Sequence, residues 1–208
     1  MKELVVLVAD KNTQFVIEGL LSRREALAIR PFHYDIYVHP HHDPGVYHQA
    51  PSFLEVFQNQ YQFALVLLDK EGSGQEHQSV SNLAADLKAR IEQAGWVGRV
   101  EVIVLEPELE VWAWVNSPHL ARELGWRDLQ ELHAFVRSRG FWSEHAAKPE
   151  RPKEAVETAL RHKNIQRSSA IYKKIAERAS FRSCRDKSFE RFQTTLRNWF
   201  GQERLHET

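Results

Sequence analysis

The first half of the chain alternates between apolar runs typical of strands and patterns typical of amphipathic helices. Residues 3–10 and 63–69 are apolar at consecutive positions, as expected of strands buried on both faces of a sheet. Residues 33–39 alternate between apolar and polar side chains, which also predicts a strand. A fourth strand begins at residue 99 and leads into a tryptophan-rich segment.

Helical patterns separate these strands. Residues 13–27, 52–61 and 77–95 place apolar side chains at helical spacing, and Thr13 is a candidate N-cap for the first of these helices. Residues 39–51 are dense in Pro, Gly and His, which predicts a loop. The alternation of strands and helices predicts an α/β fold with a mostly parallel, four-stranded sheet and right-handed crossovers.

From about residue 118 the strand patterns stop. Five helical patterns follow, separated by Gly, Pro or Asp residues, at positions 119–125, 128–140, 152–162, 169–180 and 188–200. We therefore predict an α/β domain over residues 1–117. A helical, basic C-terminal region over residues 118–208 is expected to dock on it.

The net charge of zero conceals an asymmetry along the chain. Residues 1–147 contain 13 Lys and Arg against 20 Asp and Glu, whereas residues 148–208 contain 15 against 8. A basic C-terminal region indicates either a polyanionic partner or solvated helix surfaces. The single cysteine, Cys184, excludes an internal disulfide and fits a reducing compartment. Because the first apolar run is too short for a signal peptide or a membrane span, we expect a cytoplasmic protein without membrane association.

Acidic residues stand where three of the predicted strands end. Asp10 follows the first strand, Asp69 and Glu71 follow the third, and the segment 106–110 with Glu110 follows the fourth. The carboxyl ends of parallel strands meet at one edge of a sheet, where converging carboxylates repel each other. A divalent cation removes that repulsion, and oxygen ligands suit Mg²⁺ or Mn²⁺. The sequence therefore indicates a metal site at this edge.

Two other interpretations of these segments remain open. Asp69 and the glycines at 72 and 74 also suit an ordinary solvated turn, and the acids of 106–110 also suit a helix N-terminus. Gly72 and Gly74 would also allow close approach of a phosphate, as in a nucleotide-sensing module, although no P-loop or dinucleotide fingerprint is present. The histidine-rich stretch from His39 to His48 is a candidate zinc site, a substrate-contacting loop or a solvated loop.

The segment 161–185 combines basic residues with hydroxyl groups and a tyrosine. This composition suits contacts to a nucleic-acid backbone, although a partner protein or solvent would suit it as well. The candidate nucleic-acid-binding residues are Lys11, Arg167, Lys173, Lys174, Arg178 and Arg182.

Residues 3–115 resemble the Toprim domain, the metal-binding α/β domain of topoisomerases, primases and overcoming-lysogenization-defect nucleases. The resemblance lies in a strand that ends in an acid, here Asp10, followed by a helix and a later strand that ends in D-x-E, here Asp69 and Glu71. Toprim domains usually have Glu at the first of these positions and a second Asp at the last. The segments "ELEVWAW", "RPKEAVE" and "RSSAIYKKIAER" are similar to Toprim-like proteins of bacterial defence islands, in particular those of methylation-associated phage-defence systems.

The resemblance implies a metal-dependent nuclease or phosphotransfer component of a prokaryotic antiphage system that acts on DNA. Catalytic roles would then fall on Asp10, Asp69 and Glu110, and Mg²⁺ or Mn²⁺ would be held by Asp69, Glu71 and Glu110. In this interpretation Asp10 is the general acid or base. The alternative is a non-catalytic adaptor that docks other defence-system proteins and retains a degenerate metal site.

Overall fold

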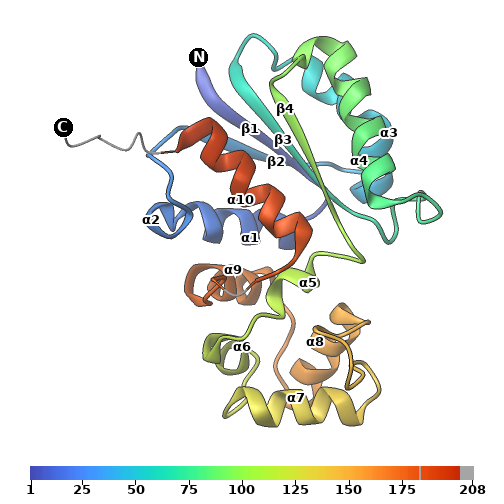
Figure 1. Ribbon diagram of the computed structural model, residues 1–208, viewed down its shortest axis with the longest axis vertical. Coiled ribbons are helices and arrows are strands. Elements are labelled where there is room, and N and C mark those ends of the chain that lie inside the picture. Colours follow the sequence, from blue (N-terminus) through green and yellow to red (C-terminus); the bar gives the residue numbers. More distant parts are fainter. Residues whose placement is uncertain (183, 202–208) are drawn as a thin grey trace.

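The computed structural model describes residues 1–182 and 184–201. Its centre is one sheet of four parallel strands in the order β2-β1-β3-β4 (Figure 1). The strands are β1 (Lys2–Val8), β2 (Tyr34–Val38), β3 (Tyr61–Asp69) and β4 (Val100–Leu105). The predicted α/β fold with a four-stranded parallel sheet is therefore confirmed.

Helices connect the strands and cover both faces of the sheet. The connecting helices are α1 (Lys11–Leu21), α2 (Arg24–Leu27), α3 (His42–Glu55) and α4 (Val80–Ile91), which continues into the π-helical turn η1 (Glu92–Trp96). In Figure 1, α3 and α4 lie on one side of the sheet, and α1 and the last helix lie on the other.

The predicted helical C-terminal region is also present. Its helices are α5 (Glu110–Ala113), α6 (Pro118–Glu123), α7 (Leu129–Ser138), α8 (Pro152–His162), α9 (Ser169–Arg178) and α10 (Lys187–Phe200). Helix α9 packs along α1, and α10 packs against β4. Helices α6, α7 and α8 lie beyond the carboxyl ends of the strands (Figure 1).

Two hydrophobic cores result from the alternation of side chains along each strand. On one face, Leu7 and Val66 pack with Trp96 under α3 and α4. On the other face, Leu67 belongs to a larger core that includes Phe192 of α10. Because this second core also contains residues of α5 to α9, the sheet and the C-terminal helices share one apolar interior.

The helix predicted over residues 52–61 is limited to 52–55, the end of α3, because residues 56–60 form turns and β3 begins at Tyr61.

Two further local predictions were wrong. The stretch 39–51 is not a loop, because His42–Glu55 forms α3 and buries Val46, Ala50 and Leu54 against the sheet. Its prolines are accommodated, one of them in the first turn, where no backbone donor is needed.

The other correction concerns the N-cap of α1. The cap is Asp10, whose side chain accepts a hydrogen bond from the backbone N–H of Thr13, the residue predicted to be the cap.

Within residues 1–182 and 184–201, no helix is both long enough and apolar enough to cross a membrane.

Candidate metal centre

A pocket of about 520 Å³ opens at the edge where the strands end. Residues that follow each of the four strands line it, together with residues from the start of α8. We call it the carboxylate pocket. Its lining residues are Asp10, His42, Asp43, Asp69, Glu71, Gly72, Glu108, Lys153, Glu154 and Glu157.

Asp10 has a structural role on one of its oxygens. Its Oδ1 accepts hydrogen bonds from the backbone N–H and the hydroxyl of Thr13, both at 2.8 Å. These bonds satisfy donors in the first turn of α1 and fix the carboxylate at the rim of the pocket. In the described residues Oδ2 makes no hydrogen bond within the protein and is available to a ligand.

Asp69 is the link between the strand ends. Its Oδ1 accepts a hydrogen bond from Leu109 N at 2.9 Å, and its own backbone N–H donates to Asp43 Oδ1 at 2.7 Å. Burial raises the pKa of Asp69 well above its usual range, and the nearby charges of Asp43, Glu110 and Asp10 raise it further. The sheet thus holds this carboxyl group where its ionisation is costly.

Two more carboxyl groups of the pocket have raised pKa values. Burial, with a contribution from Asp10, raises the pKa of Asp43 to about 6. Burial and the charge of Glu110 raise the pKa of Glu108 to about 7, although Lys153 opposes the shift from 3.4 Å. Burial and the neighbouring carboxylates both make ionisation of these acids unfavourable.

Glu110 lies next to the pocket and already forms an ion pair with Arg167 within the protein. The side chain is 2% exposed, and Oε1 accepts hydrogen bonds from Arg167 Nη2 at 2.9 Å and from the Tyr172 hydroxyl at 2.6 Å. Arg167 also donates to Glu157 at 2.8 Å. Glu110 therefore connects α5 to α8 and α9. Its negative charge also raises the pKa of Asp69.

Glu71 lies outside the strand that carries Asp69. Strand β3 ends at Asp69, and Glu71 is exposed in the turn that follows. The turn needs the positive φ angles of Gly72 (81°) and Gly74 (77°). Both glycine N–H groups donate to Glu76 Oε1, so the position proposed for a phosphate is taken by a carboxylate of the chain itself.

The pocket supplies the oxygen donors that Mg²⁺ or Mn²⁺ prefers. In the described part of the chain, however, no group of three or more His, Cys, Asp or Glu side chains is positioned to hold a metal ion. Asp10, Asp43 and Asp69 each accept a hydrogen bond from a backbone N–H group on one carboxylate oxygen.

Comparison of the chain with protein-family models, with curated proteins and with solved structures found no match. The resemblance to Toprim domains therefore stays a hypothesis.

In the described residues, the histidines of the stretch His39 to His48 do not come together as a group of three potential metal ligands. His39 is buried, and its Nδ1 accepts a hydrogen bond from His41 N at 3.2 Å. A Cβ atom at Gly45 would lie 2.3 Å from the same Nδ1, so only glycine lets α3 approach this ring. His42 is exposed and lines the carboxylate pocket.

Three of the predicted nucleic-acid-binding residues are held in ion pairs. Arg167 pairs with Glu110 and Glu157, Lys173 pairs with Glu18 at 2.9 Å, and Arg178 pairs with Glu123 at 3.2 Å. Lys11, Lys174 and Arg182 are exposed. Arg182 lines a different pocket, between α1 and α10.

The sequence analysis missed Asp43 and Lys153 as members of the pocket. The signal for Asp43 was present, because it follows the second strand just as Asp10 follows the first. Its interpretation as part of a histidine-rich loop concealed that position. Lys153 had no such signal, since it reaches the pocket only because the start of α8 folds back over the segment after β4.

Proposed function

We propose that the carboxylate pocket binds Mg²⁺ or Mn²⁺ and hydrolyses phosphodiester bonds of DNA, as a Toprim-like component of a prokaryotic antiphage system. One observation supports it best: carboxyl groups from the ends of all four strands line one pocket, where burial, together with their mutual charges, raises the pKa values of Asp43, Asp69 and Glu108. A divalent cation would relieve this repulsion, and the donor chemistry fits such an ion.

The bound ion would supply positive charge for a phosphate oxygen and for an attacking water. Asp69 and Glu71 would hold the ion, with Asp43 and Glu108 as further carboxylates within the pocket. Asp10 would accept the proton of the attacking water through Oδ2, the oxygen that does not cap α1, and return it to the leaving alkoxide oxygen of the cleaved phosphodiester. Lys153 places a positive charge beside the phosphate. Glu110 acts as a positioning residue because Arg167 and Tyr172 hold it.

A non-catalytic adaptor is the second candidate. It is favoured by the neutralisation of Glu110 and by the carboxylates already engaged with backbone donors. In that case the C-terminal helices would dock other defence-system proteins, and the carboxylate pocket would be a remnant of a metal site.

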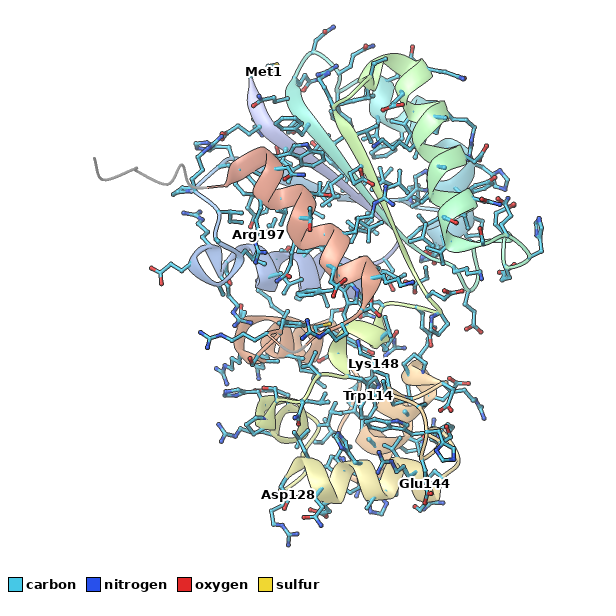
Figure 2. The ribbon with its side chains drawn as sticks, in the orientation of Figure 1. Met1, Trp114, Asp128, Glu144, Lys148 and Arg197 are labelled. Carbon is cyan, nitrogen blue, oxygen red and sulfur yellow. The ribbon has the colours of Figure 1, made fainter. Side chains whose placement is uncertain are left out.

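Calorimetric titration with Mn²⁺ distinguishes the two candidates. We expect saturable binding to the wild-type protein and its loss in Asp69→Asn, because the substitution keeps the size of the side chain but removes its charge. Glu144→Gln is the matched control, since Glu144 is exposed and lies between α7 and α8, far from the sheet (Figure 2). It should bind Mn²⁺ as the wild type does.

The activity test uses supercoiled plasmid DNA. The wild type and Glu144→Gln should nick it when Mn²⁺ or Mg²⁺ is present, and Asp69→Asn should not. Equal binding heats in wild type and Asp69→Asn, or no cleavage by the wild type with any divalent ion, would contradict the proposal. Full phage protection by cells that carry Asp69→Asn would favour the adaptor.

A further inference from the structure

A second pocket of about 520 Å³ lies between the α1–α2 turn, the loop after α9 and α10. Its walls are partly apolar, with Leu20, Leu27 and Phe189. Four arginines also line it, against the two carboxylates Glu25 and Glu190. We call it the arginine pocket, and its arginines are Arg23, Arg182, Arg185 and Arg197.

None of the four guanidinium groups forms an ion pair within the part of the chain that the structure describes. The contrast with the neighbouring helices is clear, because Arg167, Lys173 and Arg178 are each paired with a glutamate. Four like charges around one pocket repel each other, and the two glutamates leave an excess of positive charge. An anionic ligand would relieve this repulsion.

Two of the arginines are fixed before any ligand binds. Arg23 Nη1 donates to Ala176 O at 3.0 Å and to Ala179 O at 2.6 Å. Arg197, which lies on α10 (Figure 2), donates from Nε to Leu27 O at 3.0 Å. Among residues 1–182 and 184–201, the remaining N–H groups of both side chains have no hydrogen-bond acceptor. Such fixed guanidinium groups match the oxygens of a phosphate and lose little freedom on binding.

An aromatic surface accompanies the charges. The rings of Phe181 and Phe189 stack with centroids 4.7 Å apart, and the guanidinium of Arg23 lies 5.9 Å from the centre of Phe181. Phe181 is only half-buried, which leaves part of its ring for a planar base. The volume of the pocket lies within the range of small-molecule sites.

We propose that the arginine pocket binds a phosphorylated nucleoside, either a free nucleotide or one unit of a single-stranded nucleic acid. Arg182 and Arg185, which are exposed, contact the phosphate together with the fixed Arg23 and Arg197. The base packs against Phe181. This site is separate from the carboxylate pocket and needs no divalent ion.

The test is calorimetric titration with adenosine 5′-monophosphate in a buffer that contains EDTA. We expect saturable binding by the wild type, at least tenfold weaker binding of adenosine, and weaker binding of inorganic phosphate alone. Arg182→Gln/Arg185→Gln should bind the nucleotide at least tenfold more weakly. Because both side chains are exposed, the thermal unfolding midpoint of this variant should equal that of the wild type.

Arg122→Gln/Arg161→Gln is the matched control, since it removes the same charge from exposed positions outside the pocket. It should bind as the wild type does, and so should Asp69→Asn, which separates this site from the proposed metal centre. A ten-residue deoxythymidine strand identifies the source of the ligand: competition with the nucleotide indicates a strand, and no competition indicates a free nucleotide. Absence of nucleotide binding by the wild type, or equal losses in both double variants, would overturn the proposal.

Discussion

At the scale of single residues, the carboxylate pocket contains acids that change their charge near neutral pH. Glu108 is 5% exposed and has a pKa of about 7, and Asp43 has a pKa of about 6. Both acids bind protons in the folded protein at pH values where they would already be ionised in the unfolded chain. They therefore stabilise the fold relatively more at low pH than at high pH.

The expected pH dependence of the stability of Glu108→Gln follows from the direction of this effect. In the wild type, Glu108 is protonated in the folded state at pH 5 and ionised at pH 8, so folding loses stability as pH rises from about 4.5 through about 7. The glutamine does not ionise. The midpoint of thermal unfolding of the variant, relative to that of the wild type, should therefore rise between pH 5 and pH 8.

The measurement is differential scanning fluorimetry with EDTA present, and each kcal/mol of relieved repulsion should raise the midpoint by about 2–4 °C. Comparison of the variant with the wild type at each pH cancels the opposing effect of His39 and His133, whose pKa values are lowered by burial. If the difference in unfolding midpoint between the two proteins stays constant from pH 5 to pH 8, this would contradict the raised pKa of Glu108.

At the scale of secondary-structure elements, α8 and α9 hold the segment that follows β4. The buried carboxylate of Glu110 on α5 accepts hydrogen bonds from Arg167, just before α9, and from Tyr172 within α9. Lys153 of α8 contacts Glu108 through both its backbone N–H and its side chain. These contacts connect the C-terminal helices to the pocket at the end of the sheet.

Replacement of Arg167 by methionine should therefore be costly. The change leaves the buried charge of Glu110 without its ion-pair partner, and we expect a loss of about 3 kcal/mol in the free energy of unfolding, since Arg167 is itself one third exposed. Lys173→Met is the control, because the pair of Lys173 with Glu18 is more exposed and should contribute less than about 1 kcal/mol. Urea denaturation measures the free energy of unfolding of the two variants. Equal losses would show that the contacts of Glu110 contribute no more to stability than the exposed pair of Lys173 with Glu18.

The elements were predictable where burial follows a simple period. Strands β1 and β3 and helices α8 and α10 appear in the sequence as regular apolar patterns, because each has one dominant environment along its length. Helix α3 was missed because its Pro, Gly and His residues favour turns locally. Its burial against the sheet and the approach of Gly45 to His39 are tertiary effects that no local pattern reports.

The candidate site, like the secondary-structure elements, was predictable only in part. Asp10 and Asp69 follow from the rule that parallel strands end at one edge, and the structure places both in one pocket. The partners of Glu110 were not predictable, because Arg167 lies 57 residues further along the chain and meets it only through the packing of α9. The arginine pocket likewise combines residues from both ends of the sequence.

At the scale of the whole molecule, the sheet and the C-terminal helices share one core. Phe192 and Leu196 of α10 are fully buried in the same cluster as Leu65 and Leu67 of β3. Lys148 adds a polar connection, since its Nζ donates to Val111 O at 2.6 Å between α5 and the segment before α8 (Figure 2). A core continuous across both regions makes independent unfolding of either one unfavourable, so we expect a single cooperative unit.

Hydrogen exchange in Phe192→Ala tests this expectation. The substitution removes a fully buried ring and should lower the free energy of unfolding by about 3–5 kcal/mol. If the molecule is one cooperative unit, exchange should accelerate by similar factors in the slowest amides of β3 and of α9, although the change lies in α10. Thr194→Ala, at an exposed position of the same helix, should leave both rates unchanged. Faster exchange in α9 and α10 with unchanged protection in β3 would instead mean that the α/β domain of residues 1–117 folds independently of the helices that follow it.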